Sequence, residues 1–406
     1  MEPATLSLHR KLQIAIFFVL SSAVILHAIH PITAGILHFL SVHPLLTVVT
    51  TLAAGVLIFF HLRSQPHPVF LLNYSCYKPP PERKCNYELA SKFLLTHGRF
   101  TSPEPVEFMR NIYSKSGLSD ATYVPPFMFE ESQTPSHKNA VQEAEEGIFS
   151  AVDSLLSKTN ISPEEIDVVI VTCGGFSPSP SLSSLIVNHY NMKPDVKTYN
   201  LSGMGCSSGV LTVDLARRIL IGGGRKIKNI LVVITERITG VSLTKDLIRV
   251  AGVNLRQHVK ILAPRVLPLS QLVRYICSVL AMAMSSGKMK PIVPDFMNAF
   301  EHICVHTGGK AVIEQVGRVM KFDDFVTEPA RMTLNRFGNT SSSLVFYELA
   351  YFEAKKRVKK GDKMWMLAFG TGFKVGSLVW KWINEPEPES DNPWNDSIHQ
   401  YPLKTW

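Results

Sequence analysis

Apolar and polar positions divide the chain into a long uncharged stretch and a region of alternating strand and helix patterns. From Leu12 to Leu62 there is no Asp, Glu, Lys or Arg, whereas a helix needs only about twenty apolar residues to cross a bilayer. His30 and Pro31 interrupt this stretch, so we expect two transmembrane helices that form a hairpin. Basic residues flank both ends and favour a cytosolic location for both: Arg10, Lys11 and Arg63.

A cleaved signal peptide is the alternative interpretation of this stretch. The apolar run is longer than a signal peptide requires, and no small-residue cleavage site stands out in it. We therefore predict an anchor, separated from the globular part by the polar, proline-bearing segment Ser64 to Pro68.

Beyond this linker, the pattern predicts an α/β fold. Ile166 to Val171 and Ile230 to Thr235 are continuous apolar runs typical of buried strands, and Ala140 to Leu156 has helical spacing. Val69 to Tyr74 alternates like a strand, and a polar, proline-rich region follows from Lys78 to about His137. Further strands are predicted at Val196–Leu201, Ala299–Val305, Met364–Ala368 and Val375–Trp380, and helices at Leu182–Tyr190, Ser207–Leu220, Lys310–Met320 and Ser343–Lys356. This order favours two tandem α/β halves with strands covered on both faces.

Charge and cysteine content narrow the classes of partner. The formal net charge of +9 would attract phosphates, whether on coenzyme A, on anionic lipid headgroups or on nucleic acid. No zinc-finger spacing and no compact basic cluster is evident, so a nucleic-acid partner is not expected. The six cysteines form no C-x-x-C pair, which indicates neither a disulfide framework nor a metal site and fits a reducing compartment.

The sharpest chemical feature is the run NLSGMGCSSG at Asn200 to Gly209. Cys206 lies among small residues at the junction of a predicted strand and a predicted helix. Small neighbours allow a thioester to approach, and a helix N-terminus stabilises a thiolate. Cys206 is therefore a candidate nucleophile, although a buried cysteine more often packs as a small apolar residue.

Three other places carry candidate site residues. His306 follows an apolar strand and precedes two glycines, so it lies at a strand end where sites form. Asn339 lies in RFGNTSSS, where it could act in a site or only cap the next helix. Gly370, Gly372 and Phe373 form a loop that could allow close backbone approach to a substrate or could be a plain turn.

Several motifs together resemble the plant 3-ketoacyl-CoA synthases, and the resemblance covers nearly the whole chain in order. They are NYSCYKP from Asn73, PSLSSLIVNHY from Pro180, NLSGMGCSSG, EHICVHTGGKAVIE from Glu301, RFGNTSSS from Arg336, AFGTGF from Ala368 and NPWNDSIHQYP from Asn392. The resemblance implies a thiolase-like fold of two tandem α/β halves after the transmembrane hairpin. It also implies four parts: an anchor at 1–63, an N-terminal half at 64–239 with the nucleophile, a C-terminal half at 240–385 and a tail at 386–406.

The resemblance implies the condensing step of very-long-chain fatty acid elongation, with long-chain acyl-CoA and malonyl-CoA as substrates. Cys206 would carry the acyl group, while His306 and Asn339 would assist decarboxylation and stabilise the enolate oxygen. No metal or other cofactor is implied. The expected location is the endoplasmic reticulum membrane with the catalytic part facing the cytosol, as a homodimer or with other elongase subunits.

The chain departs from the family pattern in one large feature. Where relatives continue after Glu236 with an additional block, this chain runs almost directly into GVSLTKDL at Gly240. Loss of a block from the first sheet could abolish activity, so the alternative function is an impaired membrane-bound partner of intact elongase subunits. An altered transcript or gene prediction is a third explanation.

Two supporting positions complete the expected site. Asn335 stands where many family members have histidine; an amide can exchange hydrogen bonds but cannot take a proton at neutral pH. His302 matches a family histidine and, four residues before His306 on a strand, would face the same side. His302 could equally be a packing residue.

Overall fold

The computed structural model describes residues 2–3, 68–97, 104–125, 129, 136–236, 247–285, 292–306, 308–370 and 372–404. Met1–Pro3 and Phe70–Trp406 form one compact unit, and Ala4–Val69 form a second. The transmembrane hairpin predicted for Leu12 to Leu62 lies outside the described residues. Among the helices that are described, none combines the length and the apolar character needed to cross a bilayer.

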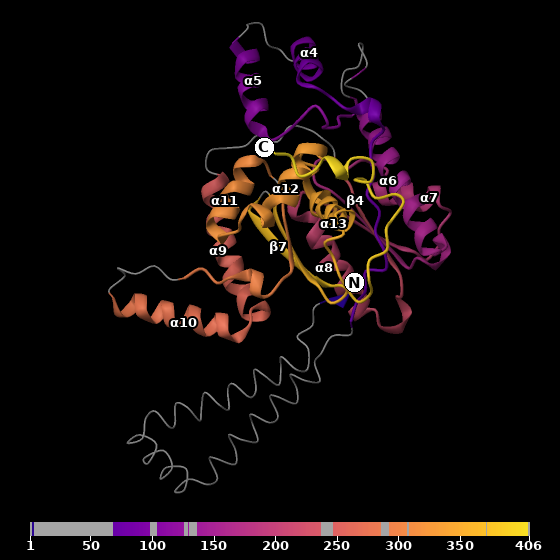
Figure 1. Ribbon diagram of the computed structural model, residues 1–406. Helices are drawn as coiled ribbons and strands as arrows, with labels where there is room; N and C mark the ends of the chain where they lie inside the picture. The colour runs from indigo at the N-terminus through magenta and orange to yellow at the C-terminus, as the bar shows by residue number, and fades with distance from the viewer. Residues whose placement is uncertain are drawn as a thin grey trace. The chain divides into compact units, whose positions relative to one another are not determined.

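A parallel three-stranded sheet forms the first half of the described globular unit (Figure 1). Its central strand β2 (Val168–Cys173) pairs with β3 (Lys197–Ser202) on one side and β4 (Ile230–Ile234) on the other. All six residues of β2 are buried, which confirms the prediction of a buried strand from an unbroken apolar run. Helices α6 (His137–Thr159) and α7 (Leu182–His189) pack on one face of this sheet.

A second sheet, in the order β1-β7-β6-β5, forms the other half. Strands β5 (His302–Val305) and β6 (Lys363–Gly370) are parallel, and β7 (Lys374–Lys381) pairs with β6 and with β1 (Glu2–Pro3) in antiparallel fashion. Side chains of α9 (Leu247–Val266), α11 (Lys310–Met320) and α12 (Asp324–Phe337) pack on one face, and those of α13 (Leu344–Ala354) pack on the other.

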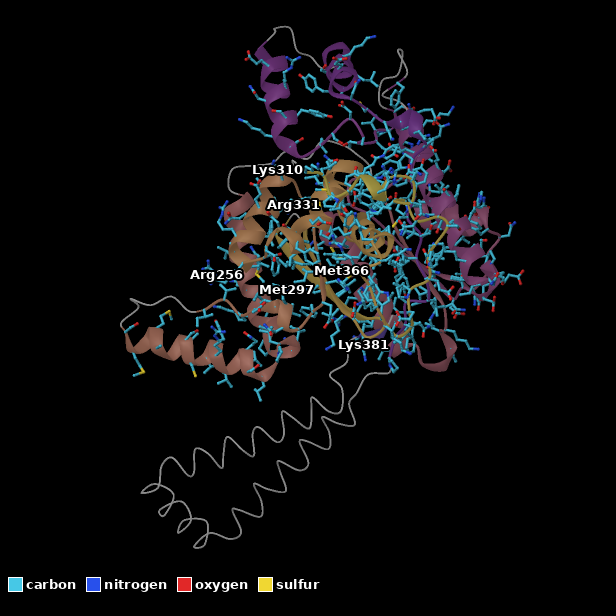
Figure 2. The ribbon with its side chains drawn as sticks, viewed as in Figure 1. Arg256, Met297, Lys310, Arg331, Met366 and Lys381 are labelled. Carbon is cyan, nitrogen blue, oxygen red and sulfur yellow. The ribbon has the colours of Figure 1, made fainter. Side chains whose placement is uncertain are left out.

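Helix α8 (Ser208–Gly222) lies between the two sheets. Its Val210 packs with Met364 and Met366 of β6, whereas its Ala216 packs with Val168 of β2. Met366, labelled in Figure 2, is fully buried. The helix that starts beside the candidate nucleophile is therefore the element shared by both halves, and its position depends on apolar packing from both sheets.

The structure corrects several expectations from the sequence. Residues 69–74 are not a strand, and the region predicted as polar and proline-rich contains helices α4 (Tyr87–His97) and α5 (Glu104–Ser116). Strand β3 is not covered on both faces, because five of its six residues are exposed. Helices α9, α10 (Leu269–Met284) and α12 were not predicted. The short 3-10 helices are Pro81–Arg83, Pro163–Glu165, Gly205–Ser207, Gly224–Lys226, Phe296–Asn298, Ser341–Ser343 and Ile398–Gln400.

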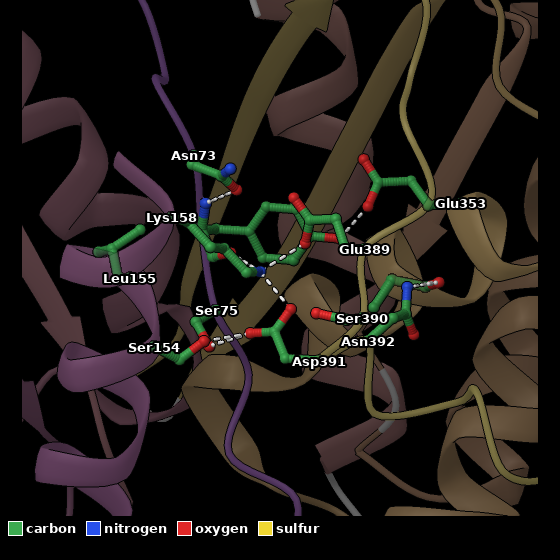
Figure 3. A network of polar contacts seen from close by, with 12 residues as sticks. Asn73, Ser75, Ser154, Leu155, Lys158, Glu353, Glu389, Ser390, Asp391 and Asn392 are labelled. Atoms are coloured by element: carbon green, nitrogen blue, oxygen red, sulfur yellow. Dashed lines mark hydrogen bonds and ion pairs between the residues drawn. The ribbon is translucent and has the colours of Figure 1, made fainter. Parts of the chain in front are cut away.

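A polar network holds the C-terminal tail against the N-terminal part of the unit (Figure 3). The Lys158 ammonium of α6 contacts Glu389 Oε2 and Asp391 Oδ1, each at 2.5 Å, and donates to the carbonyl of Tyr74 at 3.0 Å. The Tyr74 hydroxyl donates to Glu353 of α13. Segments distant in the sequence are thus joined by charged groups that lie mostly out of water, where such contacts are stronger than at an exposed surface.

Candidate active site

Cys206 lies in the turn that leads from β3 into α8. Gly203 and Gly205 adopt positive φ angles of 67° and 61°, a conformation that costs glycine little and other residues more. The chain then forms the 3-10 turn Gly205–Ser207 before α8 begins at Ser208. The predicted placement of this cysteine at a strand-to-helix junction is confirmed. The residues that directly follow it form the first turn of the helix, whose backbone amides have no partner within the helix.

The environment of the Cys206 thiol favours its protonated form at rest. Burial raises the pKa of this thiol, a hydrogen bond with Ser341 lowers it in part, and the negative charge of Glu236 raises it further. The sequence suggested that the helix N-terminus would favour the thiolate, but the net direction is upward. A neighbouring base must therefore remove the proton before the sulfur can attack.

His306 follows β5 and is held through the backbone of the second sheet. Its amide donates to the carbonyl of Leu367 in β6 at 2.9 Å, and its side chain is buried. Burial lowers the pKa of His306 to about 4, so the imidazole is neutral at neutral pH. Within the described chain, its Nδ1 has no hydrogen-bond partner. A neutral, buried imidazole with an unused nitrogen can accept a proton or donate to a substrate oxygen.

Asn339 occupies the loop between α12 and α13. Its side-chain oxygen accepts a hydrogen bond from the Ser341 amide at 2.9 Å, which forms a local turn. Asn339 does not cap the following helices, whose N-cap residues are Thr340 and Ser343. The same turn carries Ser341, whose side chain lies close enough to Cys206 to lower the pKa of its thiol. The oxygen of Asn339 thus shapes the loop beside the thiol, and its amide nitrogen is the group that a substrate could use.

Close backbone packing fixes this loop and the end of β6 against the turn of Cys206. A Cβ atom placed on Gly209 would lie 2.2 Å from the carbonyl oxygen of Ser342, and one placed on Gly370 would lie 2.4 Å from Ser207 Oγ. Only glycine permits such approaches. The structure therefore brings Cys206, the Asn339 loop and the end of β6 together, and His306 lies beside β6 in the same sheet.

The loop after Gly370 lies next to the nucleophile turn. Gly372 has a φ of 114°, and the Gly372–Phe373 peptide bond is cis. The Phe373 ring is partly buried against the core of the second half, and the Lys374 ammonium lies 3.1 Å from Met204 Sδ. This position agrees with a loop near a substrate, and the substrate-binding role of Gly370, Gly372 and Phe373 stays a prediction.

The two supporting residues have structural partners elsewhere. His302 Nε2 lies 2.8 Å from Asp362 Oδ2, and its ring packs near Phe352. Asn335 Oδ1 accepts from Ser119 Oγ at 3.2 Å and its amide donates to the carbonyl of Gly117 at 3.3 Å. Both contacts are those of packing residues that join neighbouring segments, as one of the sequence interpretations allowed for His302.

Sequence reasoning missed the carboxylate of Glu236. Its Oε1 accepts from the Gly174 amide at 2.7 Å and from Ser342 Oγ at 3.0 Å, so it bridges the end of β2 to the Asn339 loop. Burial raises the pKa of Glu236. The available signal was its place directly after a buried strand, at the carboxyl edge of a parallel sheet where ligand sites form.

Comparison with known proteins identifies similar sequences and folds. The profile described as FAE1/Type III polyketide synthase-like protein matches residues 61–240 and 235–284, and that of the 3-oxoacyl-(acyl-carrier-protein) synthase III C terminal matches residues 297–382. The chain is 37% identical to 3-ketoacyl-CoA synthase 11 of Arabidopsis thaliana, over 88% of this chain and 83% of that protein. It is also 37% identical to 3-ketoacyl-CoA synthase 17 of Arabidopsis thaliana, over 88% and 87%.

The fold resembles that of solved type III polyketide synthases. The structure of 1,3,6,8-tetrahydroxynaphthalene synthase from Streptomyces coelicolor A3(2) matches with a TM-score of 0.55 and 15% identity, covering 76% of this chain and 98% of the other. This similarity establishes the thiolase-like α/β fold predicted from the sequence.

The alignments also have gaps on the side of this chain. The alignment with 3-ketoacyl-CoA synthase 11 spans 425 positions but includes 88% of 406 residues, about 357, so about 68 positions have no counterpart here. The first profile matches in two pieces that overlap at residues 235–240, the place where the sequence analysis expects the departure from the family pattern.

Proposed function

Since this chain belongs to the plant 3-ketoacyl-CoA synthase family, we propose that it condenses long-chain acyl-CoA with malonyl-CoA through an acyl group carried on Cys206. Members of this family catalyse the condensing step of very-long-chain fatty acid elongation. The observation that carries the proposal is the position of Cys206 at the start of α8, where the loop that presents Asn339 packs closely on Gly209.

The first half-reaction moves the acyl group from coenzyme A to the enzyme. His306 accepts the thiol proton, the Cys206 sulfur attacks the thioester carbonyl, and coenzyme A leaves as a thiol after it receives that proton. His306 is neutral at neutral pH, so a ring nitrogen is free to take the proton, and its low pKa means that the imidazolium returns the proton readily to the departing coenzyme A. The product is an acyl-cysteine thioester and free coenzyme A.

The second half-reaction forms the carbon–carbon bond. Malonyl-CoA loses carbon dioxide, and the resulting enolate attacks the acyl-cysteine carbonyl and expels the cysteine thiolate. The product is a 3-ketoacyl-CoA two carbons longer than the starting acyl group. A donor hydrogen on His306 and the amide of Asn339 would stabilise the enolate oxygen as its charge develops. These steps use coenzyme A thioesters and need only groups of this chain.

Elongation by microsomes that contain the full chain tests this proposal. Cys206→Ala removes the acyl carrier, so elongation should fall to the background of the host membranes. Cys85→Ala is a matched control, because Cys85 is a buried thiol in the segment before α4, outside the proposed machinery. Elongation by the Cys206→Ala protein at the rate of the parent chain would refute the acyl-cysteine mechanism.

The alternative function is that of an impaired, membrane-bound partner of intact elongase subunits. Two observations favour this alternative: about 68 positions of the alignment with 3-ketoacyl-CoA synthase 11 have no counterpart in this chain, and the first profile matches in two pieces. The purified chain would then fail to elongate acyl-CoA alone yet co-purify with an intact 3-ketoacyl-CoA synthase. Turnover by the purified chain would refute this alternative, and sequencing of the transcript across the codons for Glu236 and Gly240 separates it from an error in gene prediction.

Homodimer formation is also part of the proposal. Strand β3 pairs only with β2 in the described sheet, and five of its six residues are exposed, including Tyr199. An open strand edge offers unpaired backbone groups to a second copy of the chain. A Thr198→Pro substitution removes one such backbone donor and should shift the purified protein toward the monomer in light scattering. An unchanged mass would argue against this interface.

Location in the endoplasmic reticulum membrane with a cytosol-facing catalytic part remains a proposal from the uncharged N-terminal stretch. The proposed orientation is measured by protease protection of microsomes that contain the protein with a tag after Trp406. Digestion of the tag in sealed vesicles supports the proposed orientation, and protection contradicts it.

A further inference from the structure

Helix α10 is apolar in composition, but protein covers its described side chains only in part. Of its sixteen residues only Arg274 is charged, and none of its described side chains is buried. Leu272 is its contact with the core of the second half. Ile276 and Met284 are 55% and 87% exposed. In Figure 1, α10 extends beyond α9. The segment that follows it contacts one side of the helix, because the amides of Ile292 and Asp295 donate to the side chains of Ser278 and Gln271.

The neighbouring helix α9 adds apolar and basic groups to the same exposed region. One side of α9 packs on the core through Leu255 and Ala263, while Ile261 on its outer side is 61% exposed. Arg256, labelled in Figure 2, is exposed as well. The exposed charged residues of both helices are all basic: Arg256, Lys260, Arg265 and Arg274.

The charge of α9 and α10 indicates what kind of partner could cover their exposed surface. Residues 247–285 contain five basic residues and no acidic residue, and Lys288 and Lys290 follow in the sequence. An apolar helix with basic residues and no acidic residue suits the boundary between anionic headgroups and acyl chains. A second copy of the same surface would instead place like charges opposite each other, which is unfavourable.

The length of α10 distinguishes lying on a membrane from spanning it. Sixteen residues of helix extend about 24 Å, less than the roughly 30 Å of the hydrocarbon core. We propose that α10, with the basic outer face of α9, inserts into the surface of an anionic lipid bilayer as a second membrane contact, separate from the predicted N-terminal hairpin. This contact would hold the globular unit near the phase in which long acyl chains dissolve.

Native Cys277 provides a reporter for this contact, because it is exposed on α10. The full-length protein, reconstituted in nanodiscs, is labelled at Cys277 with a polarity-sensitive fluorophore, and Cys277→Ala gives the background from other thiols. Lipids with a quencher high on the acyl chain are then added. Roughly half of the signal should be lost in discs that contain phosphatidylserine, because an interfacial helix buries its apolar face about 5–10 Å into the boundary.

Two variants and one control position give the test its specificity. Ile276→Asp with Met284→Asp should abolish the quenching. In anionic discs, Arg274→Gln should lower the ratio of inserted to free helix about fivefold and reduce the quenching accordingly. In neutral discs it should leave the quenching unchanged. A label at Phe325→Cys, in the Cys277→Ala background, reports an exposed apolar position on α12 and should stay unquenched.

Three results would overturn the proposal. The first is a Cys277 label with the same signal in anionic discs as in detergent, and the second is equal quenching at positions 325 and 277. The third is a signal that changes with protein concentration in detergent but not with lipid quencher, which would assign α10 to a contact between two copies of the chain.

Discussion

Gly370→Ala should displace the turn that holds the proposed nucleophile. Gly370 is the last residue of β6, and an added Cβ atom would lie 2.4 Å from Ser207 Oγ and 2.8 Å from both the Ser207 amide and the Met204 carbonyl oxygen. Unstrained nonbonded contacts are about 3.5–4.0 Å long. Because two of the three opposing atoms belong to the backbone, the turn and the strand must separate by roughly 1 Å.

The separation sets the expected size of two effects. Forcing one extra carbon into a packed interior typically costs about 1–3 kcal/mol of folding free energy. A displacement of about 1 Å in a reacting group can reduce the rate about 100-fold. We therefore expect Gly370→Ala to lower kcat more than it lowers stability, since the strain falls on the residues that flank Cys206.

Gly222→Ala is the matched control. Gly222 ends α8, no atom lies within 4 Å of its added Cβ atom, and its φ angle is not positive. Alanine there should leave kcat unchanged and stabilise the protein by at most about 1 kcal/mol. Melting temperature in detergent and elongation at saturating acyl-CoA measure the two effects.

The rate at which iodoacetamide alkylates Cys206 compares the two variants with the parent protein without requiring catalysis. The test therefore also applies if the chain is catalytically impaired. The reasoning is refuted if Gly370→Ala keeps the melting temperature, the kcat and the alkylation rate of the parent protein. The close approach of β6 to the turn would then not be present in the folded molecule.

Three further predictions concern buried charges. Burial raises the pKa of Glu353 from 4.5 to about 7, so the folded state holds this proton more tightly than the unfolded state does. The free energy of unfolding should therefore fall by up to about 3 kcal/mol as pH rises from about 4.5 to 7. Urea titrations should show a smaller loss for Glu353→Gln. Glu236→Gln removes a charge that raises the pKa of Cys206, so the pH midpoint of Cys206 alkylation should fall, and an unchanged midpoint would contradict this coupling. Lys158→Met leaves Glu389 and Asp391 without their cation. The expected loss of stability is about 2 kcal/mol, between the values for exposed and buried ion pairs, and it should appear as faster proteolysis of the C-terminal tail.

The sequence predicted best those elements whose burial is reflected in a simple pattern. Strands β2 and β4 are continuous apolar runs, and each was placed to within two residues. Helix α12 was missed for the opposite reason. Its buried residues include Glu328 and Arg336, and Arg357 and Asp396 respectively neutralise their charges. Charged and amide side chains are typical of a surface segment, and the partners that make their burial possible come from distant parts of the chain, so the sequence alone does not indicate that this helix is buried on nearly all sides.

The candidate site shows the same division between local and distant information. The position of Cys206 could be predicted because the turn, the glycines and the helix start lie within one short run. Glu236 could not be assigned a function, because its hydrogen-bond partners, Gly174 and Ser342, are 62 and 106 residues away in the sequence. Its effect on the Cys206 pKa depends on that tertiary contact, which no pattern of neighbouring residues encodes.

The break in the family pattern falls where the first sheet has an open side. Among the described strands, β4 pairs only with β2, so its outer backbone groups require water or a partner. The turn of Cys206 does not depend on that edge: Gly370 of β6 and Ser342 of the Asn339 loop hold it from the second half. Glu236, the last described residue before the break, still fastens the end of β4 to that loop. The residues proposed for the chemistry are therefore present and held from the second half, whereas a displaced edge of β4 would release Glu236 and with it the contact that raises the pKa of Cys206.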